Sequence, residues 1–277
     1  MTLCNKGKNV PTEYTKDEAV SLKKKGFKKL NSLLESLLST SNGNELDDKA
    51  GFKKVALISK WIYQYANYIE FETKFNPTRY INYKRGDIVF VNFGFGVGTE
   101  FGGNHYAVVL NNDVKHNSSN ITVIPLSSYK GVGTVHERDV FLGNELYEKL
   151  ALKSRTNIAS LREQHSNNKV MLKLLKEKLS LSSPKSEDFD EITQLEELLR
   201  KNQNNIDREI MDMGRLINEL DSLKEGSVAK IEQIRTISKM RIYNPRGKRD
   251  PLYKISFSVA TMNKINDKLK ELFVFEE

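Results

Sequence analysis

A histidine, a glutamate and two serines lie beside one glycine-rich loop between residues 83 and 128. The β-forming residues on either side predict three strands, which include Ile88 and Phe90, His105–Leu110, and Ile121–Leu126. Glu100 and His105 flank the last two glycines of the loop, and Ser127 and Ser128 end the third strand. Two neighbouring strand ends therefore bring an imidazole, a carboxylate and hydroxyls toward one loop. An imidazole at such a place suits proton transfer, because its pKa lies near neutrality.

The loop itself is dense in glycine. Its five glycines are Gly94, Gly96, Gly98, Gly102 and Gly103. Glycine tolerates positive φ and lets a ligand come close to the backbone. The loop is not followed by G-K-[ST] or by a helix-like segment, which disfavours a nucleotide-binding phosphate loop.

Three short motifs in this stretch resemble a known family. Arg-Gly-Asp at residues 85–87 opens the first strand, G-x-E-x-G-G at residues 98–103 precedes V-V-L, and V-x-P-L-S-S ends at Ser128. Their order and spacing resemble the MazF/PemK family of toxin endoribonucleases. A second block, residues 227–242 (SVAKIEQIRTISKMRI), is similar to a later strand of that family. The resemblance implies a small β-barrel that cleaves RNA and pairs with an antitoxin.

The resemblance also implies roles for single residues. The family uses an arginine in the slot after Gly-Gly and a threonine or serine at the end of the third strand. Here His105 occupies the first slot and Ser127 the second. We predict that His105 is the general acid or base, that Ser127 with Ser128 binds the scissile phosphate, and that Arg235 or Arg85 supplies positive charge.

The other predicted substrate-binding residues come from the same two blocks. They are Gly98, Glu100, Gly102, Gly103, Tyr106 and Gln233. Glu100 has a second interpretation, as a structural acceptor for loop amides. Tyr106 and Phe101 either stack on unpaired bases or pack internally. Gln233 and Arg235 alternate along a predicted strand, so both are expected to reach one groove.

RNA supplies its own nucleophile, the 2′-hydroxyl, so its cleavage needs proton transfer and charge stabilisation but no metal. His105, His116 and His136 have no paired spacing typical of metal ligands. We therefore expect neither a metal site nor a cofactor.

Composition limits the class of protein. The chain has 277 residues, with 44 Lys and Arg against 36 Asp and Glu, a net charge of +8. This excess favours polyanion partners, and the resemblance implies that the partner is single-stranded mRNA. The single cysteine, Cys4, rules out an internal disulfide, and no apolar run is long enough to cross a membrane. These features predict a cytoplasmic protein without a membrane partner.

Residues 1–80 predict a helical N-terminal extension. Apolar residues recur at helical spacing over Thr15–Thr40 and again over Phe52–Phe75, and Pro77 ends the second helix. The aromatic residues of the second helix favour packing, against the barrel or a second subunit, over a ligand pocket. The lysines at residues 23–25, 28 and 29 are typical of a solvated helix face.

Residues 144–225 predict an antiparallel coiled-coil hairpin inserted between barrel strands. The first seam is Ile158, Leu161, His165, Asn168, Leu172, Leu175 and Leu179. The second seam is Ile192, Leu195, Leu199, Asn202, Ile206, Glu209, Met213, Leu216, Leu220 and Leu223. A turn at residues 182–186 places Leu175 opposite Leu195, His165 opposite Ile206, and Asn168 opposite Asn202. Leu152, Val170 and Met171 lie outside the seam and are candidates for partner contact.

The predicted fold is α+β: an SH3-like, CcdB/PemK-type barrel in two parts, residues 81–143 and 226–277. The second part is expected to include a strand at Tyr253–Val259 and a helix at Ala260–Phe273, and the first a short strand at Val135–Phe141. The resemblance implies a homodimer inhibited by an antitoxin protein. Two alternatives remain open: a CcdB-like gyrase poison without nuclease activity, and a non-catalytic interaction protein that uses the arm.

Overall fold

The computed structural model describes residues 13–39, 45–112, 116–181, 186–220, 223–248 and 250–274. The chain forms two compact units, Met1–Thr73 and Lys74–Glu277. In the part of the chain that the structure describes, no helix combines the length and apolar character needed to cross a membrane.

The first unit is a pair of helices, α1 (Lys16–Ser39) and α2 (Glu45–Glu72). α1 agrees with its predicted range to within one residue, whereas α2 begins seven residues before the predicted start at Phe52. The helices approach closely at Gly51, where a Cβ atom would lie 2.8 Å from the carbonyl oxygen of Leu37. The Trp61 ring lies 5.8 Å from Tyr65 and 6.3 Å from Tyr68, centroid to centroid. The α1 lysines at residues 23–25, 28 and 29 are exposed.

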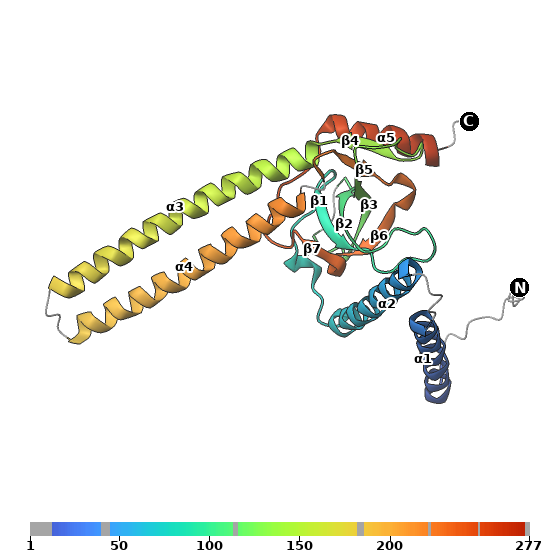
Figure 1. Ribbon diagram of the computed structural model, residues 1–277, viewed down its shortest axis with the longest axis horizontal. Coiled ribbons are helices and arrows are strands. Elements are labelled where there is room, and N and C mark those ends of the chain that lie inside the picture. The colour runs from blue at the N-terminus through green and yellow to red at the C-terminus, as the bar shows by residue number, and fades with distance from the viewer. Residues whose placement is uncertain are drawn as a thin grey trace, which may run out of the picture. The chain divides into compact units, whose positions relative to one another are not determined.

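The second unit is built on a seven-stranded sheet whose strand pairs are all antiparallel. The strands are β1 (Ile88–Asn92), β2 (Asn104–Val109), β3 (Asn120–Ser128), β4 (Val140–Gly143), β5 (Ser227–Ala229), β6 (Arg235–Ser238) and β7 (Ile242–Asn244). Their order is β4-β5-β3-β2-β1-β7, and β6 also pairs with β3 (Figure 1). β6 pairs with β3, whereas β7 pairs with β1 at the end of the strand order. Because only the 3-10 turn Lys239–Arg241 joins β6 to β7, the sheet must curve to bring these strands together.

Alternation along the central strands gives the sheet two apolar faces. One face carries Val91, Ala107 and Val123, which pack with Tyr83 and Ile237 in one buried cluster. The other face carries Val108 and Ile124 and packs against α5 (Val259–Phe273) and the start of α3. A mixed α and β unit with an antiparallel sheet and several helices results.

Three predicted strands differ from those observed. The single strand predicted over residues 227–242 is three short strands separated by 3-10 turns. The strand expected at Val135–Phe141 begins only at Val140. Just before it, the Asp139 amide donates to the His136 carbonyl in a turn, and the Asp139 carboxylate forms an ion pair with Lys230. The segment Tyr253–Val259 contributes only a bridge, Asp87 to Ser256, since Lys254 adopts a φ of 61° that breaks an extended strand.

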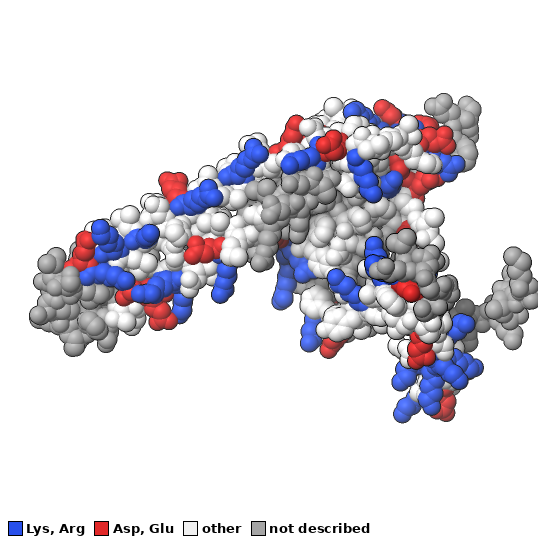
Figure 2. Space-filling model, viewed as in Figure 1, with Lys and Arg blue, Asp and Glu red and all other residues white. Residues whose placement is uncertain are grey.

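Between β4 and β5 the chain forms two long helices, α3 (Glu145–Leu181) and α4 (Ser186–Leu220). They contact each other and extend side by side from the sheet (Figure 1). His165 Nε2 lies 3.3 Å from Asp207 Oδ1 across the pair. Charged side chains of both signs are interspersed along this arm (Figure 2). Residues 182–185 of the predicted turn lie outside the described residues, as do the side chains of Leu179, Ile192, Met213, Leu216 and Leu220.

Side-chain burial agrees with the predicted seam in α3 but not with the one in α4. The described α3 positions Ile158, Leu161, His165, Asn168, Leu172 and Leu175 are all buried or half-buried. In α4, Leu199 and Ile206 are buried, but the predicted seam residues Leu195, Asn202 and Glu209 are exposed. Their places are taken by residues 196, 203 and 210, each one position further on. The predicted Asn168–Asn202 layer is therefore wrong, and Gln203 faces α3 in place of Asn202.

Candidate active site

The glycine-rich loop, residues 93–103, is closed by its own backbone. Phe93 donates its amide hydrogen to the Gly103 carbonyl at 2.7 Å, and Gly103 donates to the Gly94 carbonyl at 2.7 Å. The Gly94 amide donates to Asn92 Oδ1 at 2.8 Å. Gly94 and Gly103 have φ values of 80° and 85°, which favour glycine. The loop is therefore a fixed feature between β1 and β2.

Two further glycines are required by close packing within the loop. A Cβ atom at Gly96 would lie 2.7 Å from the Glu100 carbonyl oxygen, and one at Gly102 would lie 2.9 Å from the Gly94 carbonyl oxygen. At Gly98 the space is open. The exposed Glu100 carboxylate accepts a hydrogen bond from the Val97 amide at 3.0 Å. This contact matches the structural interpretation of Glu100.

His105 follows the loop on β2, opposite Val91. Its imidazole is half-buried against Phe101, with ring centroids 4.4 Å apart. Burial lowers the pKa of the imidazole, and a hydrogen bond with the Gly102 backbone opposes this shift in part. The neutral ring, with a nitrogen free to accept a proton, is therefore the favoured form at neutral pH.

Gln233 and Arg235 connect the loop to β6. Gln233 Oε1 accepts a hydrogen bond from the Phe101 amide at 3.0 Å and another from Arg235 Nη2 at 3.4 Å. The Arg235 guanidinium lies 5.4 Å from the centroid of the Phe93 ring. Gln233 belongs to a 3-10 turn and not to the predicted strand, yet both residues reach the same loop. The structure thus joins His105, Phe101, Gln233 and Arg235 in one chain of contacts.

Ser127 comes from the third strand of this region. Ala107 pairs with Pro125, so His105 and Ser127 lie two residues beyond that pair on β2 and β3, each on the face of Val91 and Val123. Beyond Pro125, β3 turns to pair with β5, and Ser127 lies opposite Val228. Ser127 is half-buried, whereas Ser128 is exposed and alternates to the other face. The Arg235 pairing with Val123 places its side chain on the same face as His105 and Ser127.

Comparison with known families adds to this geometry. Residues 84–176 match the family described as PemK-like, MazF-like toxin of type II toxin–antitoxin system. Proteins of this family are generally endoribonucleases. The match includes the loop, His105 and Ser127, and it ends before Gln233 and Arg235. No curated protein shows a significant match to the chain.

Two predicted site residues lie apart from the others in this PemK-like region. The Arg85 guanidinium donates to the Leu110 carbonyl and to Asn266 Oδ1, at the opposite end of the β1–β2 pair from His105. That end is roughly 17 Å away along five residues of strand. Tyr106 points to the opposite face of the sheet from His105 and packs on Phe90 at 5.1 Å. Neither residue joins the site.

Three residues at the foot of the PemK-like loop were not predicted from the sequence. Asn92 is buried, and its Nδ2 lies 3.2 Å from the Tyr243 hydroxyl. Arg241 Nε donates to the Asn92 carbonyl at 2.8 Å. These contacts join positions about 150 residues apart, which spacing along the chain cannot reveal. Among the described residues, no three His, Cys, Asp or Glu side chains are grouped to hold a metal ion.

Proposed function

We propose that the chain is a metal-independent endoribonuclease that cuts single-stranded RNA at selected sequences. The contact chain from His105 through Phe101 to Gln233 and Arg235 carries this proposal. It puts a proton acceptor and a guanidinium on one face beside the loop, and the PemK-like match supports RNA as the substrate class.

In the proposed reaction, neutral His105 removes the proton of the ribose 2′-hydroxyl. The 2′-oxygen then attacks the adjacent phosphorus, and the bond from phosphorus to the 5′-oxygen breaks. The products are a 2′,3′-cyclic phosphate and a 5′-hydroxyl, which receives its proton from the imidazolium or from water. The lowered pKa of His105 supports the role of base.

Stabilisation of the negative charge on the phosphoryl oxygens is assigned to Arg235 and Ser127. A guanidinium presents fixed paired donors to a phosphate, and a hydroxyl adds one more. Gln233 and the amides of Gly98 and Gly102 are proposed to contact the RNA strand near the cut. Ser128, on the other face of β3, and the Gly103 amide, bonded to the Gly94 carbonyl, are left out of this role. Arg85, fixed to Leu110 and Asn266, is left out of this role.

The biological role proposed is that of a toxin in a toxin–antitoxin or phage-defence pair, acting on mRNA in the cytoplasm as a homodimer and inhibited by an antitoxin protein. In this interpretation residues 81–143 and 226–277 form an SH3-like barrel. Residues 144–225 are a coiled-coil hairpin inserted into the barrel, and residues 1–80 are a helical extension. The exposed Leu152, Val170 and Met171 on α3 are candidate antitoxin or partner contacts.

Incubation of the purified protein with a long RNA in EDTA tests the activity. Cleavage by the wild type, lost in His105→Gln with the fold intact by circular dichroism, supports the proposal. Gyrase-dependent DNA breaks without RNA cleavage favour the CcdB-like alternative. If neither activity is detected, the result favours a non-catalytic interaction protein.

A further inference from the structure

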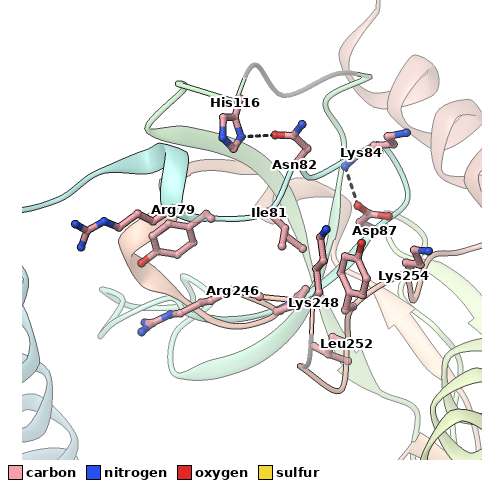
Figure 3. Close-up of a pocket in the computed structure, with 14 residues that line it drawn as sticks. Arg79, Ile81, Asn82, Lys84, Asp87, His116, Arg246, Lys248, Leu252 and Lys254 are labelled. Carbon is pink, nitrogen blue, oxygen red and sulfur yellow. Dashed lines mark hydrogen bonds between the residues drawn. The ribbon is translucent and has the colours of Figure 1, made fainter.

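A separate cavity of about 600 Å³ lies at the other end of the β1–β2 pair from His105. One wall comes from residues 79–87, before and at the start of β1, and the other from residues 245–254, after β7 (Figure 3). His116, in the turn between β2 and β3, closes the edge, and its Nδ1 donates to Asn82 Oδ1 at 2.6 Å. We call this cavity the basic pocket.

The basic pocket carries a strong excess of positive charge. Its cationic side chains are Arg79, Lys84, Arg246, Lys248 and Lys254, and all are exposed. Within the described part of the chain, none of these side chains forms an ion pair with a carboxylate. The lining includes one carboxylate, Asp87, whose Oδ2 accepts a hydrogen bond from the Lys84 amide at 2.8 Å. Clustered cations without carboxylate partners favour an anionic ligand.

The walls of the basic pocket are fixed to each other. The buried Tyr83 hydroxyl donates to the Pro245 carbonyl at 2.6 Å and ties the two walls together. The Leu252 amide donates to Asn244 Oδ1 at 3.0 Å, and Arg246 Nε donates to the Ile242 carbonyl at 2.6 Å. Lys254 adopts a φ of 61°, a conformation that non-glycine residues rarely hold unless their surroundings impose it. The pocket is thus preformed.

Two aromatic rings lie among these cations. The Arg246 guanidinium lies 5.9 Å from the Tyr80 ring, and Lys254 Nζ lies 5.6 Å from the Tyr253 ring. In Figure 3, Arg79 and Arg246 extend toward one end of the pocket, and Lys84 and Lys254 lie toward the other. Both tyrosines are half-buried. Cations bind phosphate, and aromatic rings stack on nucleobases.

We propose that the basic pocket binds a nucleoside phosphate, supplied as a free nucleotide or as a unit of an RNA strand. The volume suits a ligand of that size, since small-molecule pockets measure about 300–1,000 Å³. Tyr80 and Ile81 of this pocket pack on the same apolar cluster as Phe101 of the candidate active site. The pocket is proposed independently of nuclease activity.

Calorimetry with the full chain tests the pocket, with AMP, ATP, inorganic phosphate and a short RNA that is 2′-O-methylated throughout as probes. The methylated RNA lacks the nucleophile and stays intact. The pocket variant is Arg79→Glu with Lys248→Glu. The control is Lys169→Glu with Lys176→Glu, two exposed α3 positions with the same change of net charge. A neutral pair, Arg79→Gln with Lys248→Gln, serves if the first variant does not fold.

We expect the pocket variant to weaken binding about tenfold or more, as loss of phosphate contacts predicts, and the control by less than about twofold. If the pocket variant loses AMP or ATP binding, the ligand is a free nucleotide. If it loses binding of the methylated RNA alone, the ligand is a unit of an RNA strand. Equal losses in both variants, binding of phosphate as tight as AMP, or no binding by the wild type would each overturn the proposal. His105→Gln should keep this binding while it loses cleavage, so failure of the pocket and failure of the nuclease are distinguishable.

Discussion

The ring of Phe101 lies 4.4 Å from the imidazole of His105, while the Phe101 amide donates to Gln233, 132 residues further along the chain. One loop residue therefore packs the proposed base and also fixes the loop to the strand that carries Arg235. The position of His105 depends on two segments that are distant in sequence.

Replacement of His105 by Gln should reduce RNA cleavage by about 10²- to 10⁴-fold, the usual contribution of a positioned acid or base. Glutamine keeps a polar side chain of similar size but cannot exchange the proton. The measurement is the single-turnover rate on a long RNA in EDTA. His165→Gln, on the arm beside Asp207, is the matched control and should cleave like the wild type. Comparable activity in the two variants would rule out His105 as the base.

The pH dependence of cleavage distinguishes a base from an acid. Because burial lowers the pKa of His105 below its usual value of 6.5, the neutral form persists into mildly acidic solution. As a base, His105 should keep kcat/KM level at neutral pH and lose it as the pH falls through the lowered pKa. A rate that instead falls as the pH rises through that pKa would assign His105 as the acid.

The lowered pKa of His105 also affects stability. The unfolded chain binds the proton more tightly than the folded chain, so the free energy of unfolding decreases as the pH falls below 6.5.

Patterns with a local cause could be predicted from the sequence. The alternating strands and the α3 seam follow from repeats of two and of three to four residues, and the structure shows them within a residue or two. Loop closure at Gly94 and Gly103 likewise depends on neighbouring residues.

Features fixed by distant contacts could not be predicted. The start of β4 depends on the ion pairs Arg138–Glu232 and Asp139–Lys230, whose partners are 94 and 91 residues apart. Arg85 fits the motif but is held by Asn266 of α5, 181 residues away. In α4 several polar residues next to seam positions make two registers nearly equivalent in pattern, and only packing on α3 selects one.

Substitution of Arg235 by Lys tests the charge role. Lysine keeps the charge but loses the paired donors, so kcat/KM should fall by about 10²- to 10³-fold, as for loss of one donor to a transition-state oxyanion. Arg208→Lys, at an exposed site on α4, is the control. A rise in KM alone, with kcat unchanged, would limit Arg235 to ground-state binding.

Two alanine substitutions in the loop separate its geometry from its flexibility. In Gly102→Ala the new Cβ would lie 2.9 Å from the Gly94 carbonyl oxygen, which is backbone and cannot yield without moving the loop. A displacement of about 1 Å costs about 10²-fold in rate. Gly98→Ala meets open space and carries only the cost of its φ of 64°, about 1 kcal/mol. Cleavage rates should therefore fall much further in Gly102→Ala, and equal effects would show that the loop is not fixed.

The arm offers a test of register that does not depend on function. Asn168 Nδ2 and Gln203 Oε1 are both buried without a hydrogen-bond partner among the described residues. The His165–Asp207 pair sets the antiparallel register, so Asn168, one turn along, faces the turn that contains Gln203.

Joint replacement of Asn168 and Gln203 by Leu should raise the free energy of unfolding by about 1–3 kcal/mol, because it removes two unsatisfied buried polar groups. Asn168→Leu with Asn202→Leu is the matched control, since Asn202 is exposed and its change should contribute within about 0.5 kcal/mol. Urea titration followed by circular dichroism measures both. If the Asn202 pair proved the more stable, the register predicted from the sequence would hold, and α4 would pack on α3 one residue away from the observed register.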